Sequence, residues 1–338
     1  MWRSWQAWPQ ARPDQTSRAG GKAPLSLTYV ANSGVLAAAG NVKVLIDALF
    51  DKPNPEYRAP APDVLEKITK GRTPFDGVKA AFVTHNHPDH FDARVAIRFL
   101  ETCRDALVVA PADAVAEMRG AAADWARVER RVISIDVAIG EQITRNVGPI
   151  KVTAFRTQHS GGSDSPTNIM YLLEFNGWRL FHEGDSPGNV EEYQRLGLGS
   201  TRVDLALVHF WFPLEPNCAR FLQEVLRPAH IALTHLPIRL EGDAPGKIDQ
   251  VKKYYNDIFL LLPGMAPRSL RAPSKNLAAR QPAVRTRGTP DPAEMEDGAK
   301  NLRESGGVQF RCGAASLQSP IRSLCSRRTL PLEDTQPC

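Results

Sequence analysis

Four side chains that can bind a metal ion lie within a run of only six residues. They are His85, His87, Asp89 and His90, and they follow the mostly apolar segment 79–83, which has the length of a short buried strand. In a loop at the end of a strand, all four side chains can turn toward one pocket. Imidazole and carboxylate groups suit Zn²⁺ and related borderline ions. The run therefore predicts a metal site, and it restricts the chain to folds that build a polar pocket at a strand end.

The run, THNHPDH, resembles the HxHxDH signature of metallo-β-lactamase-fold hydrolases. The resemblance covers roughly residues 25–265, and the other ligands of that family are matched in the family's order along the chain. His159 follows a predicted strand, Asp185 ends the run HEGD, and His235 follows the predicted strand 230–234. The resemblance implies a metal-dependent hydrolase with a two-metal site.

The resemblance also implies how the ligands are divided. Matched by position, one ion would be held by His85, His87 and His159, and the other by Asp89, His90 and His235, with Asp185 bridging the two. Two ions about 3.5–4 Å apart can share a hydroxide whose pKa lies near about 7, which provides a nucleophile at neutral pH. We therefore expect two divalent ions, zinc first and manganese or iron as alternatives. A bridging hydroxide would cleave a lactone, ester or phosphodiester bond in a small-molecule substrate.

Three residues are candidates for catalytic roles. Asp89 would orient the hydroxide. His209 ends a predicted strand, where it could line the substrate pocket, protonate a leaving group, or be an ordinary loop histidine. His182 comes shortly before the predicted bridging aspartate and could hydrogen-bond a metal ligand from behind, as metal sites commonly require, or simply pack. His230 has the opposite strand parity to His235, which favours a packing role.

The substrate is less constrained than the metal site. Segments 44–50 (VLIDALF) and 226–235 (LRPAHIALTH) resemble ascorbate-6-phosphate lactonases and N-acyl-phosphatidylethanolamine phospholipase D-like enzymes. The imidazole of His87 favours hydrolysis, because the oxygen-reducing di-iron branch of this fold usually has a carboxylate there. Three alternatives stay open: a nuclease or phosphodiesterase acting on nucleic acid, a non-catalytic metal-binding protein, and a mononuclear iron dioxygenase-like member.

Short strands and interspersed helices fill the central part of the chain. Strands are predicted over 25–30, 34–38, 42–48, 79–83, 107–110, 150–156, 169–175, 178–182, 204–209, 230–234 and 258–262, and helices over 93–103, 112–120, 190–196, 217–226 and 247–255. Asn176-Gly177 predicts a two-residue hairpin, because both residues tolerate the positive φ of a type I′ turn. Two mixed sheets with helices outside predict an α+β fold, a four-layer αββα sandwich.

The two ends have a different composition from the centre. Residues 1–24 and 266–338 lack hydrophobic periodicity, which predicts disordered segments around a hydrolase domain over 25–265. They carry net charges of +3 and +5, whereas the centre has 26 basic and 29 acidic residues, so the charge argues against a nucleic-acid partner. Five cysteines without a close pair argue against a disulfide framework. No apolar run reaches membrane-spanning length and no signal peptide is recognisable, so we expect a cytoplasmic protein.

Overall fold

The strands form two seven-stranded sheets with the same kind of strand pairing. The computed structural model describes residues 22–162, 165–200, 202–238, 244–255, 257–264 and 266–271. The first sheet has the order β14-β1-β2-β3-β4-β5-β6, and the second has the order β13-β12-β11-β10-β9-β8-β7. In each sheet, antiparallel pairing on one side changes to parallel pairing on the other, at β3–β4 and at β10–β11. Both sheets are therefore mixed.

The strand bounds place the predicted metal run at the end of a central strand. The first sheet contains β1 (Leu25–Ala31), β2 (Gly34–Ala39), β3 (Val42–Ile46), β4 (Ala80–Phe82), β5 (Leu107–Pro111), β6 (Val132–Ile135) and β14 (Arg268–Leu270). The second contains β7 (Gln142–Val147), β8 (Ile150–Thr157), β9 (Asn168–Phe175), β10 (Trp178–His182), β11 (Leu205–His209), β12 (His230–Thr234) and β13 (Ile258–Leu260). As predicted, Asn176 and Gly177 both have positive φ in the tight turn between β9 and β10.

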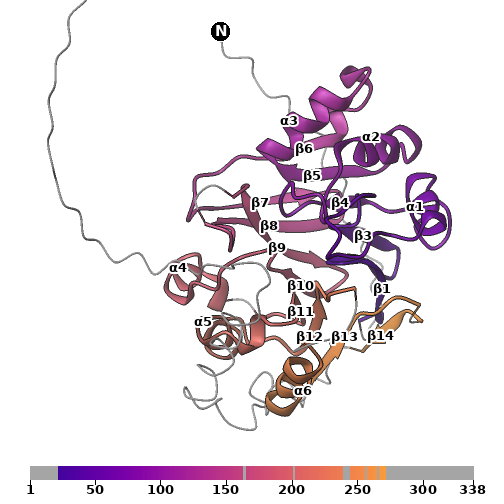
Figure 1. The fold of residues 1–338 in the computed structure, drawn as a ribbon. Coiled ribbons are helices and arrows are strands. Elements are labelled where there is room, and N and C mark those ends of the chain that lie inside the picture. Colours follow the sequence, from indigo (N-terminus) through magenta and orange to yellow (C-terminus); the bar gives the residue numbers. More distant parts are fainter. Residues whose placement is uncertain are drawn as a thin grey trace, which may run out of the picture.

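Helices cover the outer face of each sheet (Figure 1). They are α1 (Pro62–Thr69), α2 (Ala93–Thr102) and α3 (Ala112–Ala121) beside the first sheet, and α4 (Val190–Arg195), α5 (Pro216–Arg220) and α6 (Ala244–Tyr254) beside the second. Short 3-10 turns span Trp125–Arg127, Glu129–Arg131, Leu198–Ser200 and Phe212–Leu214, and α5 continues as a π-helix over Phe221–Leu226. The Asn189 side chain caps α4, by accepting from the backbone N–H of Glu192.

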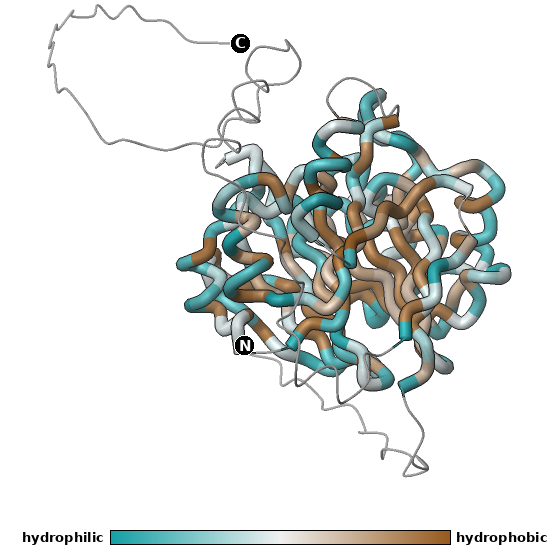
Figure 2. The backbone as a smooth tube through the Cα atoms, turned by 90° about the horizontal axis from the view of Figure 1, so that it is seen from below, coloured by the Kyte–Doolittle hydropathy of each residue, from teal (hydrophilic) through white to brown (hydrophobic). Residues whose placement is uncertain are grey.

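Three hydrophobic clusters account for the four layers. One lies between the sheets and takes residues such as Val44 and Trp178 from both of them. The second packs the first sheet against α1–α3, and the third packs the second sheet against α4 and the Phe221–Leu226 helix. Figure 2 shows hydrophobic stretches along the inner strands and hydrophilic stretches along the outer helices. The predicted four-layer αββα sandwich is confirmed.

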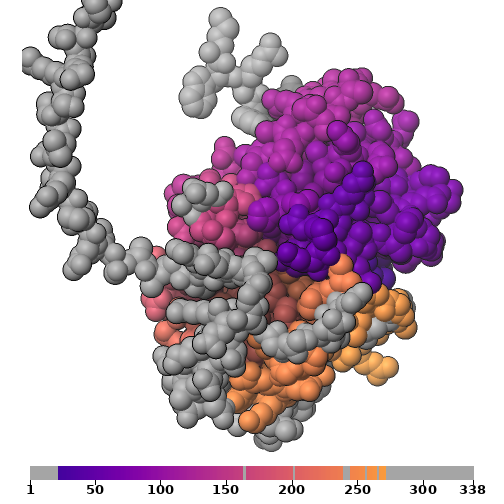
Figure 3. Space-filling model, viewed as in Figure 1, coloured from indigo at the N-terminus to yellow at the C-terminus, as the bar shows by residue number. Residues whose placement is uncertain are grey.

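The folded part is longer than the sequence predicted at both ends. Residues 268–270, assigned above to the tail, form β14, which pairs antiparallel with β1 through Leu25 and Leu270. Lys22 Nζ lies 2.9 Å from Asp204 Oδ2. Figure 3 shows the C-terminal part (orange) in contact with the N-terminal part (indigo). The rest of both predicted tails lies outside the described residues, and no helix within the described ranges is long and apolar enough to cross a membrane.

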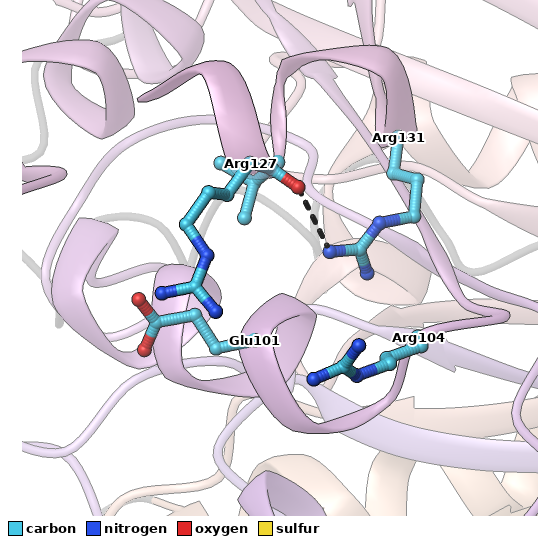
Figure 4. Close-up of a pocket in the computed structure, with 5 residues that line it drawn as sticks. Glu101, Arg104, Arg127 and Arg131 are labelled. Atoms are coloured by element: carbon cyan, nitrogen blue, oxygen red, sulfur yellow. Dashed lines mark hydrogen bonds between the residues drawn. The ribbon is translucent and has the colours of Figure 1, made fainter. Parts of the chain in front are cut away.

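Arg131 caps the C-terminus of α2 and lies beside the hollow that Figure 4 shows. Arg131 Nη1 donates to the carbonyl oxygens of Leu100 at 2.6 Å and Cys103 at 3.2 Å. A cationic side chain stabilises a helix C-terminus because it satisfies the last carbonyls and opposes their partial negative charge. Arg131 also lines a hollow of about 200 Å³ together with Glu101, Arg104, Arg127 and Val128. The contacts of Arg131 indicate a structural role, away from the predicted metal run.

We expect Arg131→Ala to lower the free energy of unfolding by about 1–2 kcal/mol, because two hydrogen bonds from a charged donor are lost. Urea unfolding followed by circular dichroism measures this change. Arg98→Ala is the matched control, since its ion pair with Asp51 spans 3.8 Å between partly exposed groups and should contribute less than about 0.5 kcal/mol. Equal stability of the two variants would contradict the capping role.

Candidate metal centre

Strand ends from both sheets meet at one place and bring the predicted ligands together. The ligand cluster, as we call it below, consists of His85, His87, Asp89, His90, His159, Asp185 and His235. The run 85–90 follows β4, and the other three residues follow β8, β10 and β12. These last three strands run in the same direction within the second sheet, so their carboxyl ends share one edge. The edges of the two sheets therefore supply opposite walls of one site.

The ligand cluster divides into the two groups that the sequence predicted. The first combines His85, His87, His159 and Asp185, and the second combines Asp89, His90 and His235. Within each group, one possible ligand atom per residue lies within 4.8 Å of all the others. A further overlapping combination, Asp185 with His209 and His235, meets the same criterion. The structure thus brings all seven predicted ligands together, and it adds His209.

Asp185 lies at the centre of the ligand cluster. Its Oδ2 is 3.5 Å from His159 Nε2, and 3.7 Å from Nε2 of both His85 and His235. Its Oδ1 is 3.4 Å from His90 Nε2. Burial raises the pKa of this carboxyl, but the surrounding imidazoles, His90 first, hold the pKa well below its usual range. Asp185 is therefore an anion that faces histidines of both groups.

Asp47 orients two of these histidines, although it is not among the residues predicted from the sequence. This fully buried residue follows β3, and its Oδ2 accepts from Thr84 Oγ1 at 2.7 Å. The same oxygen lies 2.9 Å from His90 Nδ1, while Thr84 Oγ1 lies 3.0 Å from His85 Nδ1. Because the Thr84 hydroxyl donates its proton to Asp47, its oxygen accepts from His85 Nδ1. Nδ1 is therefore the donor in both imidazoles, and Nε2 is the nitrogen that each ring turns into the site.

The free Nε2 atoms show that the donor set fits a divalent ion. Nε2 of His85 and of His90 is buried and has no hydrogen-bond partner among the described residues. A buried polar nitrogen without a partner is costly, whereas an imidazole with one nitrogen held by a carboxylate or hydroxyl is the usual arrangement of a metal ligand. His159 differs, because its Nδ1 accepts from the Gly161 N–H at 2.9 Å. An ion bound at His159 Nε2 would place the ring proton on Nδ1, so Nδ1 could no longer accept from the Gly161 N–H.

Asp89 is held in place by an amide and two imidazoles. Asn32 Nδ2 donates to Asp89 Oδ2 at 2.8 Å, and the same oxygen lies 3.2 Å from His235 Nε2 and 3.3 Å from His90 Nε2. Burial raises the pKa of Asp89, but His90 and His235 lower it far more, so the carboxyl is ionised. Its orientation is therefore fixed by contacts on several sides.

Strained backbone concentrates in this region. Asn32, Asp47 and His235 have φ values of 45°, 45° and 56°, in the left-handed region that most side chains avoid. Gly184 has φ 62°, and a Cβ there would collide with Asn168 Oδ1, which accepts from the Asp185 N–H. Such conformations persist where surrounding contacts enforce them, which is common at functional sites.

The two other predicted catalytic histidines occupy different positions. His209 ends β11, and its Nε2 lies 2.8 Å from Asp185 Oδ1. His182 lies behind the ligand cluster, where its Nδ1 accepts from the Gly184 N–H at 3.0 Å and its Nε2 is 3.9 Å from Asp47 Oδ2. His230 is at the far end of β12, and its Nδ1 is 2.8 Å from Asp257 Oδ2. Of these three, the structure therefore brings only His209 to the ligand cluster.

Two aromatic side chains border the second group. The Tyr57 ring meets the His235 ring edge-on, with 4.4 Å between centroids, and the Trp211 ring stacks on His209 at 4.5 Å. Burial raises the pKa of the Tyr57 hydroxyl, and the negative charges of Asp89 and Asp185 raise it further. Both aromatic residues are half-buried, so part of each remains accessible beside the ligand cluster.

Comparison with known proteins agrees with this architecture. The family model described as "Beta-lactamase superfamily domain" matches residues 42–241. A novel metallo hydrolase from the hyperthermophilic archaeon Ignicoccus hospitalis superposes with a TM-score of 0.51 and 17% identity, over 74% of this chain and 100% of that one. At this identity the likeness concerns the fold alone.

Two further solved structures superpose less closely. The metallo-β-lactamase fold protein YhfI from Bacillus subtilis has a TM-score of 0.49 and 14% identity, over 73% of this chain and 100% of that one. CmlA, a diiron β-hydroxylase from Streptomyces venezuelae, has a TM-score of 0.48 and 15% identity, over 75% of this chain and 55% of that one. A search of curated proteins gave no match.

Proposed function

This chain belongs to the β-lactamase superfamily, and we propose that it hydrolyses a lactone, ester or phosphodiester bond at a binuclear site. The observation that carries the proposal is the position of Asp185, whose carboxylate faces imidazoles of both ligand groups within 3.7 Å. A carboxylate between two sets of donors can be shared by two neighbouring divalent ions.

The residues of the two groups would hold the ions in the combinations that the sequence predicted. His85, His87 and His159 would hold one ion, Asp89, His90 and His235 the other, and Asp185 both. Two bound divalent ions, zinc by preference for this donor set, supply Lewis acidity that activates water and polarises the scissile bond. Asp47 and Thr84 keep the Nε2 lone pairs of His85 and His90 directed into the site.

Other side chains would act on water and substrate. Asp89 Oδ2, which Asn32 fixes, is an ionised acceptor that would orient the attacking water. The accessible parts of Tyr57 and Trp211 would contact the substrate beside the second group. The Tyr57 hydroxyl keeps its proton at neutral pH, because burial and nearby carboxylates raise its pKa, so it is available as a hydrogen-bond donor. These contacts favour a substrate with an apolar part next to the reacting group.

The test is a hydrolysis assay on the full chain with a panel of lactones, carboxylic esters and phosphodiesters. We expect turnover of at least one class with added Zn²⁺, Mn²⁺ or Fe²⁺, and a loss of about 100-fold or more after chelation, reversed by the ion, because Lewis-acid stabilisation is worth several kcal/mol. Undiminished turnover by protein shown to be metal-free would contradict the proposal. RNA and single-stranded DNA belong in the panel, since a nuclease would degrade them with the same metal dependence.

A further inference from the structure

Glu183 is a buried carboxylate that belongs to neither ligand group. It is fully inaccessible to solvent and follows β10, two residues before Asp185. Its Oε1 accepts from the backbone N–H of His209 at 2.8 Å and lies 2.5 Å from Nδ1 of the same residue. Its Oε2 lies 3.5 Å from Ser186 Oγ. Burying a carboxylate is costly unless it is paired, and here the pairing is directed almost entirely at one histidine.

His209 lies between two carboxylates. On one side its Nδ1 faces Glu183 Oε1 at 2.5 Å, and on the other its Nε2 faces Asp185 Oδ1 at 2.8 Å. A metal ligand needs a nitrogen lone pair that is free to face the ion. In His209 each nitrogen already faces an acidic oxygen, which suits a donor of hydrogen bonds and does not suit a ligand. His209 therefore differs from His85 and His90, whose Nε2 atoms lie 3.3–3.7 Å from the carboxylate oxygens that they face.

The two carboxylate oxygens of Asp185 face different partners. His209 approaches Oδ1 at 2.8 Å, and His90 Nε2 lies 3.4 Å from the same oxygen. Oδ2 lies nearest to the imidazoles of the first group and to His235 of the second. A carboxylate rotates easily about its terminal torsion unless a partner fixes one oxygen. With Oδ1 fixed by His209, Oδ2 is presented to histidines of both groups.

Packing holds the imidazole of His209 in this orientation. The Trp211 ring stacks on it, with planes only 12° apart and centroids at 4.5 Å, and the Phe212 ring lies at 6.3 Å. The backbone of His209 is fixed by β11 and by the hydrogen bond from its N–H to Glu183. The ring is thus anchored by its backbone, its face and one nitrogen, and the other nitrogen is free to position Asp185.

We propose that Glu183 and His209 form a positioning pair, which fixes Asp185 so that Oδ2 faces both metal groups, and that His209 is not itself a metal ligand. This inference rests on the proposed function, because it assigns the pair a role toward the bound ions. Groups that orient metal ligands typically contribute 10–100-fold to metal affinity or activity. The pair is therefore expected to tune the affinity and geometry of the site while leaving its capacity for two ions intact.

The experiment loads the full chain with Co²⁺ and measures stoichiometry, affinity by chelator competition, and the visible absorption spectrum. We expect Glu183→Ala and His209→Ala still to bind two ions per chain, the number of the proposed two-metal site, with affinity about 10–100-fold weaker and shifted visible bands. Glu183→Gln keeps an oxygen acceptor for His209, so its effect should be smaller. Glu191→Ala, at an exposed glutamate of α4, is the matched control and should match wild type.

Three results would overturn the inference. Unchanged affinity and spectrum in Glu183→Gln and Glu183→Ala would show that the carboxylate does not act on the site. Loss of one of two ions in His209→Ala would make His209 a ligand. If Glu183→Ala does not fold, His209→Ala decides, because an unchanged affinity and spectrum in that variant would contradict the pair. Failure of the proposed function looks different, because wild type itself would then bind no ions, or would bind them without hydrolysing any substrate of the panel.

Discussion

Replacing Asp185 with alanine is expected to abolish stable binding of both ions and to lower kcat/KM by about 1000-fold or more, which corresponds to about 4 kcal/mol of lost stabilisation. The reason is geometric. The Asp185 carboxylate lies within 3.7 Å of four imidazoles of the ligand cluster, and it is the charge shared by both groups. Without this carboxylate, the two bound ions would repel each other and would share no anion.

Elemental analysis and steady-state kinetics on the purified Asp185→Ala protein check this prediction. Asp76→Ala is a suitable control, because Asp76 is an exposed aspartate whose carboxylate pairs with Lys43. Asp185→Asn adds information, since it keeps the size of the side chain but removes its charge, and we expect it to lose activity as well. Full metal content together with full activity in either Asp185 variant would refute the central place given to this residue.

Asp47→Ala should have the largest effect on stability, about 3–5 kcal/mol of the free energy of unfolding. The side chain is completely buried and takes hydrogen bonds from Thr84 N at 2.8 Å and Thr84 Oγ1 at 2.7 Å, besides its contact with His90. Alanine leaves these buried groups without an acceptor, and each unpaired group costs about 1–3 kcal/mol. Metal affinity should fall too, because nothing then fixes the Nε2 lone pairs of His85 and His90.

Urea unfolding of metal-free protein isolates the stability effect of Asp47→Ala from that of bound ions. Asp47→Asn keeps an oxygen that can accept from the Thr84 N–H, so we expect roughly half the loss. If Asp47→Ala unfolds at the wild-type urea concentration and binds metal as tightly, the orienting role of Asp47 is wrong.

The sequence predicted the fold best where hydrophobic patterns were strong. Most strands of the second sheet are continuous apolar runs, and eight-residue β9 is buried at every position except one. By contrast, β7 is exposed at most positions, and β6 is only partly buried, so neither has a pattern that marks a strand. The three-residue strand β14 exists because it pairs with β1, a contact between distant parts of the chain that local sequence does not encode.

The metal ligands could be predicted from the sequence, but the residues that orient them could not. The spacing within 85–90 marks ligands because four donors of the right type lie close together. Asp47 and Glu183 are single acidic residues beyond the ends of strands, with no such spacing to distinguish them from surface carboxylates. Their importance comes from complete burial and from contacts with residues 43 and 26 positions away, at His90 and His209. One clue was available for Asp47, since it lies inside the apolar segment VLIDALF.

The metal-to-protein ratio of tag-free full chain, measured by elemental analysis, tests the binuclear site most directly. The arrangement of two donor groups around Asp185 predicts about two divalent ions per chain, falling to near zero in Asp185→Ala. A wild-type protein that binds no metal, even after dialysis against Zn²⁺, Mn²⁺ or Fe²⁺ and removal of the excess, would contradict the account.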